Sequence, residues 1–185
     1  MNAPVRPILM TDADFDRFLA SGASAALGRV ELRGGALVQM SPQNLPHGRL
    51  KFWIAKQLDA AVAAAGGAFV VDAYVTVRFG QGFQPLPDVT AWTGGPMVGT
   101  IPGEKVRLIV EVADSTLADD LGDKRADYAR AGLPEYWVLD VNARCVHRFH
   151  APGGDAFAKA DVFRDGERIE AATLPGVGFV LGMPG

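Results

Sequence analysis

The sequence predicts an α/β domain in which a central β-sheet is flanked by helices. A short, continuous apolar run at 108–112 is typical of a strand that is covered on both faces. Two segments, 47–67 and 115–131, carry apolar residues at helical spacing, and strand-like segments surround them. With 185 residues, 49% of them hydrophobic, the chain can form one globular domain with a substantial core. We expect a single domain over 1–185, with an arm at 1–25 and the core at 26–182.

The first third of the chain predicts a helix, a hairpin and a longer helix. Thr11 is suited to cap a short helix over 11–19, which we expect to pack as an outer arm. The segment 29–40 alternates around two adjacent glycines, the pattern of a β-hairpin. Apolar residues then recur every four positions from 50 to 62, which predicts a helix that begins at His47.

The remaining segments predict mainly strands. Alternating or continuous apolar patterns bounded by glycine, proline and aspartate are typical of strands. Tyr136 and Trp137 are interpreted as packing residues rather than as platforms for stacked bases. The last three segments are expected at the edge of the sheet or as satellites of it. The strand-like segments are 68–72, 74–79, 88–92, 108–112, 135–140, 145–150, 161–165 and 176–182.

Two charged residues stand where the pattern requires a buried core. Glu111 interrupts the apolar strand, and a lone buried carboxylate must find a cation, a metal or a proton. In the following helix, which we expect to run without interruption over 115–131, positions 117, 121, 124, 128 and 131 form one inward stripe. Lys124 therefore lies on the side of the helix that faces the core.

A third charged residue, Asp88, begins the strand at 88–92. Charged residues at positions where the pattern predicts burial are found most often at functional sites. The residue pattern leaves two alternatives open. The three groups could form a metal site, or Glu111 and Lys124 could form a buried ion pair with Asp88 solvated elsewhere.

The motifs around these residues resemble one protein family over most of the chain. They are similar to those of the Uma-type restriction endonuclease family, a branch of the PD-(D/E)xK nuclease superfamily. The resemblance implies a restriction-endonuclease-like core, with a mixed central sheet flanked by helices, an N-terminal hairpin and additional C-terminal strands. The matching segments are VELRGGALVQMSP at 30–42 with His47 behind it, PDV at 87–89, EVADST at 111–116, Asp120, Lys124, Tyr128 and GLPEYWVLD at 132–140.

The resemblance also implies a chemistry. Asp88, Glu111 and the backbone carbonyl of Val112 would hold Mg²⁺, or Mn²⁺ in its place, for the hydrolysis of phosphodiester bonds, most simply in DNA. Lys124 would orient the attacking water or balance charge on the phosphate. The usual superfamily lysine lies two residues after the glutamate, where this chain has Ala113. Lys124 would therefore reach the site from the helix.

Four further residues are candidates for supporting or substrate-binding roles. Asp120 lies four residues before Lys124, so it either supports the site or forms an ordinary helix salt bridge. For Tyr128 a core position is favoured over a hydrogen bond into the site. His47 would suit phosphate contact but equally an exposed first helical turn. Glu31 could approach the metal, although a solvent-facing hairpin position is favoured.

Composition limits the function classes. The net charge of −3 argues against tight nonspecific DNA binding by a monomer. It gives some support to an alternative to the nuclease, a catalytically inactive module that keeps the fold for nucleic-acid binding or protein assembly. A homodimer and the choice between DNA and RNA stay open. The single cysteine, Cys145, excludes an internal disulfide, and we expect a cytoplasmic protein with no membrane segment. His147 and His150 show no partner at metal-ligand spacing.

Overall fold

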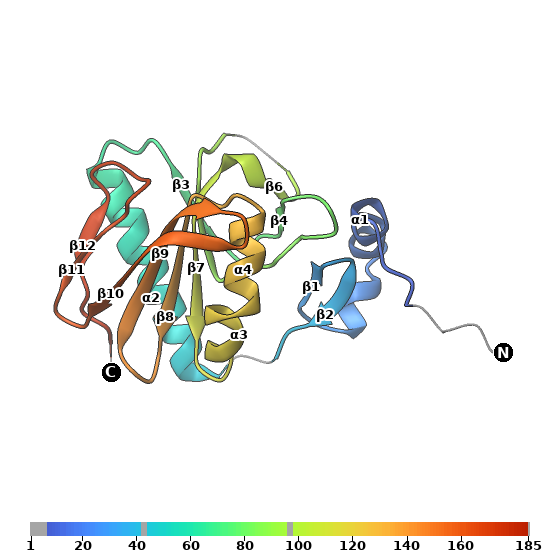
Figure 1. Cartoon of the computed structure of the whole chain (residues 1–185), viewed down its shortest axis with the longest axis horizontal. Coiled ribbons are helices and arrows are strands. Elements are labelled where there is room, and N and C mark those ends of the chain that lie inside the picture. Colours follow the sequence, from blue (N-terminus) through green and yellow to red (C-terminus); the bar gives the residue numbers. More distant parts are fainter. Residues whose placement is uncertain (1–6, 42–43, 96–97, 185) are drawn as a thin grey trace.

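The computed structural model describes residues 7–41, 44–95 and 98–184. Residues 1–6 of the expected N-terminal arm lie outside these ranges. The centre of the molecule is a six-stranded sheet with the order β10-β9-β8-β7-β5-β3 (Figure 1). Its strands are β3 (Val70–Ala73), β5 (Val89–Trp92), β7 (Val106–Ala113), β8 (Glu135–Asp140), β9 (Cys145–Gly153) and β10 (Ala156–Arg164).

The sheet is mixed, as the family resemblance implies. β7 and β8 run parallel, and the other neighbouring pairs are antiparallel. The connection from β7 to β8 passes through helices, which parallel neighbours require. The antiparallel pair β5–β7 sets Val89 opposite Val110. This register brings Asp88, the residue before β5, beside the second half of β7.

Helices cover both faces of the sheet (Figure 1). On one face, α2 (Leu45–Ala64) packs Ile54 and Leu58, both fully buried, against β5, β7 and β8. Burial of such a side chain contributes about 1.5–3 kcal/mol relative to an exposed one. On the other face, Tyr128 of α4 (Asp123–Arg130) packs against the same strands. The apolar pattern on both sides of β7 follows from this double cover.

The expectation of one continuous helix over 115–131 is wrong. The segment forms α3 (Leu117–Leu121) and α4, which are separated at Gly122 with φ −108° and ψ −108°. A Cβ at Gly122 would lie 2.7 Å from the carbonyl oxygen of Ala118, so the close turn between the helices requires glycine. Lys124 still faces inward, because the break lies between the two halves of the apolar stripe.

The N-terminal elements lie beside the central sheet, at the right of Figure 1. α1 (Asp12–Ala20) begins at a capping box formed by Thr11 and Asp14, which confirms the predicted cap. A short 3₁₀ turn, η1 (Ala23–Ala26), leads to the hairpin of β1 (Val30–Arg33) and β2 (Ala36–Gln39). Two backbone hydrogen bonds between Leu32 and Gln84, of 3.0 and 2.9 Å, attach this hairpin to the segment before β5.

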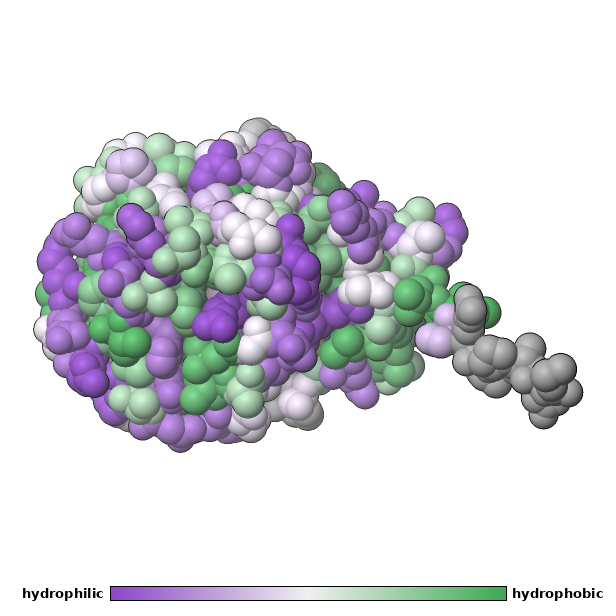
Figure 2. Space-filling model, viewed as in Figure 1, coloured by the Kyte–Doolittle hydropathy of each residue, from purple (hydrophilic) through white to green (hydrophobic). Residues whose placement is uncertain are grey.

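Small satellite pairs complete the fold. β4 (Val77–Arg78) and β6 (Ile101–Pro102) pair in parallel, and η2 (Gly103–Lys105) follows β6. The strand expected at 74–79 is therefore only two residues long. β11 (Arg168–Glu170) and β12 (Gly178–Val180) form a second small pair. Hydrophilic and hydrophobic residues are interspersed over the face shown in Figure 2. Within the described ranges, none of the helices has the length and apolar character needed to cross a membrane.

Candidate active site

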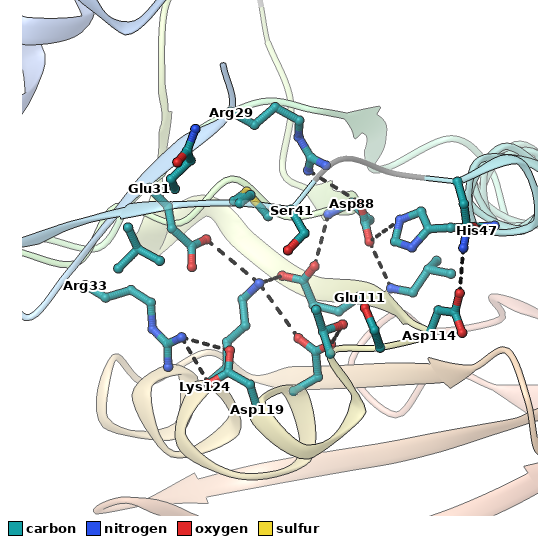
Figure 3. Close-up of a pocket in the computed structure, with 18 residues that line it drawn as sticks. Arg29, Glu31, Arg33, Ser41, His47, Asp88, Glu111, Asp114, Asp119 and Lys124 are labelled. Atoms are coloured by element: carbon teal, nitrogen blue, oxygen red, sulfur yellow. Dashed lines mark hydrogen bonds and ion pairs between the residues drawn. The ribbon is translucent and has the colours of Figure 1, made fainter. Parts of the chain in front are cut away.

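A cavity of about 180 Å³ lies where the hairpin, the start of α2, the strands β5 and β7 and the helix α3 approach one another. Its lining is unusually rich in charged groups, several of which are buried (Figure 3). The acidic lining residues are Glu31, Asp88, Glu111, Asp114, Asp119 and Asp120, and the basic ones are Arg29, Arg33 and Lys124, with His47 beside them.

Asp88 and Glu111 lie next to each other in this cavity. The N–H of Asp88 donates to Glu111 Oε2 over 3.4 Å, and the N–H of Val112 donates to Asp88 Oδ2 over 3.0 Å. Their exposed fractions are only 3% and 2%. Both contacts follow from the antiparallel register of β5 and β7. The two acids therefore share one buried environment, and Asp88 is not solvated elsewhere.

Lys124 enters the cavity from α4 and faces three carboxylates (Figure 3). Its Nζ lies 2.9 Å from Glu111 Oε1 and 3.8 Å from both Glu31 Oε2 and Asp120 Oδ1. Burial lowers the pKa of Lys124, but these carboxylates outweigh it and hold the pKa above its usual range. Lys124 is thus a fixed positive charge at the centre of the acidic group.

The protonation of Glu111 is governed mainly by its burial. Burial raises the pKa of Glu111 to about 8, against the attraction of Lys124, and the neighbouring Asp88, Asp120 and Glu31 add to the increase. The hydroxyl of Tyr128 donates to Glu111 Oε1 over 2.8 Å. Glu111 therefore takes up a proton more readily than an ordinary carboxyl does.

Asp88 is surrounded by basic groups on its other side. Lys51 Nζ donates to Oδ1 over 3.2 Å, and His47 Nε2 lies 3.2 Å from Oδ2. Arg29 Nη2 approaches Oδ1 to 3.7 Å. Burial raises the pKa of Asp88, but the contacts with His47, the Val112 N–H and Lys51 hold it well below its usual range. Asp88 is therefore an ionised ligand-type carboxylate in a buried position.

The supporting candidates also lie at the site. His47 contacts Asp88 rather than standing in an exposed first turn. Asp120 forms the helix ion pair with Lys124 and also accepts from Thr116 Oγ1 over 2.6 Å. Tyr128 is buried in the core and also donates a hydrogen bond to Glu111, so both roles considered for it are present.

The favoured solvent-facing position of Glu31 is wrong. Glu31 is 3% exposed, pairs with Lys124 and accepts a 3.4 Å hydrogen bond from the N–H of Leu86. The reason is the attachment of Leu32 to Gln84, which docks the hairpin on the core. Glu31 consequently becomes a fourth acid in the cavity wall.

Three basic residues of the site were not predicted. Lys51 had a signal, because positions 51, 54 and 58 share one helical face and the latter two are core residues. Arg29 and Arg33 had no such signal in the sequence, because they reach the cavity only through the docking of the hairpin on the core. Arg33 binds Asp119 and Asp127, and Arg29 Nε and Nη2 are buried without a hydrogen bond to the described residues.

The residues present fit a divalent cation. Mg²⁺ and Mn²⁺ prefer oxygen ligands, and the cavity wall offers the carboxylates of Glu31, Asp88, Glu111 and Asp120, all nearly inaccessible to solvent. Burial is the main cause of the raised pKa of Glu111, and the neighbouring carboxylates add to it. A divalent cation bound here would favour the ionised form of these carboxylates.

A second group of ligand-type side chains lies outside this cavity. His147 Nε2 is 3.6 Å from Cys145 Sγ, and Asp140 lies beside both. The expectation that His147 lacks a partner at metal-ligand spacing is therefore wrong. Asp140 lies on the neighbouring strand, and Cys145 lies two residues before His147 on its own strand. The spacing of residues along the sequence does not reveal this combination.

Comparison with known proteins agrees with this fold. The sequence model of the Uma2 family, described as "Putative restriction endonuclease", matches residues 13–183. A search of curated proteins gives no match. Among solved structures, a nuclease of the DUF820 group from Anabaena variabilis ATCC 29413, which its description calls putative, superposes with a TM-score of 0.66. The two chains are 13% identical, and the match covers 89% of each.

Proposed function

Since the chain belongs to the Uma2 family of restriction-endonuclease-type proteins, we propose that it is a metal-dependent nuclease that hydrolyses phosphodiester bonds, with DNA as its substrate. One observation carries this proposal. Asp88, Glu111 and Lys124, from two adjacent strands and a helix, meet at a single cavity, and all three side chains are buried. An ion pair needed only for stability would use one acid for the lysine. This cavity instead gathers four buried acids, Glu31, Asp88, Glu111 and Asp120, and all of them except Asp88 face Lys124.

Asp88, Glu111 and the backbone carbonyl of Val112 are the proposed metal ligands. A bound Mg²⁺ would supply a nucleophilic water and would stabilise the charge that develops on the phosphate. The buried carboxylates provide oxygen ligands with little freedom to move, because both accept hydrogen bonds from the backbone of the paired strand. Such fixed ligands lower the cost of forming an ordered site.

Lys124 is the proposed third member of the catalytic group. Its ammonium is held between Glu111, Glu31 and Asp120, so its position is determined by contacts on three sides. The carboxylates also keep it charged. A fixed ammonium beside the metal ligands can orient the attacking water or balance the charge of the phosphate. This role needs no lysine on the strand, where Ala113 stands.

Arg29 is the proposed contact for a phosphate of the substrate. It lines the cavity beside Asp88, and its side chain is 25% exposed. A guanidinium at the wall of such a cavity suits charge-assisted recognition of phosphate. Arg33 is different, because Asp119 and Asp127 already bind it. Arg33 would shape the cavity wall rather than bind substrate.

The decisive experiment is a cleavage assay with the purified full chain. Supercoiled plasmid, single-stranded and double-stranded DNA and RNA are incubated with Mg²⁺ or Mn²⁺, and with EDTA as the metal-free reference. We expect cleavage of DNA only with metal. Asp88→Asn and Glu111→Gln should reduce it to background, and Lys124→Met should slow it by about 10²-fold or more, as for a lost general acid–base group.

Asp155→Asn provides the matched control, because Asp155 is exposed in a turn, does not line the cavity and undergoes the same chemical change. It should retain full activity. The noncatalytic alternative predicts no cleavage of any substrate with either metal while nucleic-acid or partner binding persists. Cleavage that persists in Asp88→Asn would contradict the proposed site, and cleavage of RNA alone would contradict the proposed substrate.

A further inference from the structure

The hairpin between β8 and β9 carries the second group of ligand-type side chains. Asp140 pairs directly with Cys145, and His147 lies two residues further along β9. Residues that are opposite or two apart on paired strands point to the same face of a sheet. The backbone register therefore fixes an oxygen, a sulfur and a nitrogen donor on one face, and none of the three residues lines the cavity of the candidate active site.

The geometry of the group matches a tetrahedral cation. Zinc bonds of about 2.3 Å to sulfur and 2.0 Å to nitrogen at the tetrahedral angle require a sulfur–nitrogen separation of roughly 3.5 Å. Cys145 Sγ and His147 Nε2 are 3.6 Å apart. The ligand atoms of all three residues lie within 4.8 Å of one another.

Each side chain is also held in a suitable state. Asp140 Oδ1 accepts from the N–H groups of Asn142 and Ala143, over 2.9 and 2.8 Å, which anchors the carboxylate and leaves Oδ2 for a cation. The ring of His147 stacks on Phe149. This stacking fixes the plane of the imidazole, which binds metals through its ring nitrogens.

From this geometry we propose that Asp140, Cys145 and His147 bind a zinc-class divalent cation, with a water in the fourth position. Thiolate and imidazole select such borderline cations over Mg²⁺, so this site and the cavity would hold different metals. His147 is only partly buried, which leaves room for the water. Because a thiol binds a metal as the thiolate, metal binding should release the proton of Cys145.

Titration of the reduced full chain with Co²⁺ tests the proposal directly. Cys145 is the only cysteine, so a thiolate-to-cobalt charge-transfer band in the near ultraviolet can come from no other residue. We expect one such band with a one-to-one end point, together with visible bands of tetrahedral cobalt, and both should disappear when Zn²⁺ is added. Absence of the charge-transfer band from folded wild-type protein would overturn the proposal.

Variants separate a three-ligand site from a thiol that binds cobalt alone. His147→Gln and Asp140→Asn should weaken Co²⁺ binding by about tenfold or more, because even outer-shell partners of a metal contribute that much. Asn keeps the oxygen that holds the turn. His150→Gln is the matched control, since His150 points to the opposite face of β9, and it should bind normally. Unchanged affinity in both ligand variants would refute the site.

The cobalt signal should not depend on the residues of the proposed nuclease site. Asp88→Asn should keep the charge-transfer band and its end point, whatever its effect on cleavage. Circular dichroism of each variant establishes that the fold is intact. Should Cys145→Ser fail to fold, the two other ligand variants still decide the outcome, because both retain the thiol that reports binding.

Discussion

The N–H of Asp88 lies 3.4 Å from Glu111 Oε2, although the two residues are 23 positions apart in the sequence. This contact joins the start of one strand to the middle of its neighbour and places two buried carboxylates together. Like charges at such close range in a medium of low polarity are unfavourable unless a proton or a cation intervenes. Most of the expected behaviour of the site follows from this single relationship.

Metal binding should stabilise the folded chain. A ligand that binds only the folded state adds about 2.7 kcal/mol to the free energy of unfolding at a hundred times its dissociation constant. Thermal unfolding with increasing Mn²⁺, measured against EDTA, should therefore show a rising Tm in wild-type protein. Asp88→Asn should abolish most of the rise, because it removes one proposed ligand while preserving the shape of the side chain.

The control for this measurement is Asp155→Asn, which should show the same Mn²⁺-dependent rise in Tm as the wild type. The zinc-class site proposed at Asp140 must not contribute to the signal. The experiment is therefore repeated with Mg²⁺, which thiolate and imidazole ligands bind poorly. An equal rise in Asp88→Asn with Mg²⁺ would show that the ion binds elsewhere.

Stability without metal should depend on pH through Glu111. Its pKa is raised from 4.5 to about 8 in the folded protein, so the folded state binds this proton more tightly than the unfolded state. Below about pH 4.5 the carboxyl is protonated in both the folded and the unfolded state and does not change the free energy of unfolding. Between about pH 4.5 and about pH 8 the ionisation of Glu111 lowers the free energy of unfolding progressively as pH rises, and above about pH 8 this loss is constant.

Glu111→Gln removes this titration and keeps the size of the side chain. In EDTA, the free energy of unfolding of Glu111→Gln relative to wild type should increase from pH 5 to pH 8 and then level off, as measured by urea unfolding. Glu104→Gln, at an exposed position, should show no such trend. A difference between Glu111→Gln and wild type that is flat across this range would contradict the raised pKa.

Much of the candidate site could be predicted from local pattern. Glu111 interrupts a strand covered on both faces, and Lys124 falls on the inward stripe of a helix, so each residue conflicts with its position. Such conflicts are visible in the sequence because strands and helices have fixed periods. The pairing of β5 with β7, which brings Asp88 to Glu111, is seen only in the structure.

The remainder depends on contacts between distant segments. Glu31 and Arg29 belong to a hairpin whose alternation permits either face to be buried, and its docking on Gln84 decides which. The break at Gly122 depends on a 2.7 Å approach to the Ala118 carbonyl, whereas a single glycine in a helical pattern is compatible with a continuous helix. Asp140, Cys145 and His147 are united by a strand register that residue spacing does not give.

Two buried tyrosines offer a matched test of the hydrogen bond to Glu111. The rings of Tyr128 and Tyr136 lie 4.8 Å apart, and both are fully buried. Tyr128 donates to the Glu111 carboxylate, whereas Tyr136 donates to the backbone carbonyl of Asp120 over 3.1 Å. Replacement of either by Phe should lower the free energy of unfolding by about 1 kcal/mol. Only Tyr128→Phe should also change the affinity for Mn²⁺, measured by calorimetry.

Comparable changes in Mn²⁺ affinity for Tyr128→Phe and Tyr136→Phe would mean that the two hydroxyls act through general packing. The two variants lose the same hydroxyl group from the same aromatic cluster, so the volumes left empty by the two substitutions are similar. The comparison therefore isolates the contact with Glu111 Oε1.

Lys51 should stabilise the metal-free protein through Asp88. Its ammonium lies 3.2 Å from Asp88 Oδ1 and 3.2 Å from the centre of the Tyr74 ring, and the residue is 3% exposed. Removal of one partner of a buried ion pair leaves a carboxylate with less neutralisation. We expect Lys51→Met to lower the free energy of unfolding in EDTA by roughly 2 kcal/mol, less than for an isolated buried pair, because Arg29 and His47 also face Asp88.

Lys56→Met is the control for this change, because Lys56 is exposed on the same helix. It should alter the free energy of unfolding by no more than about 0.5 kcal/mol. If Lys51 balances the charge of Asp88, saturating Mn²⁺ should restore most of the stability lost in Lys51→Met, since the ion then supplies the missing positive charge. A loss that is the same in EDTA and in Mn²⁺ would instead assign Lys51 to packing against Tyr74.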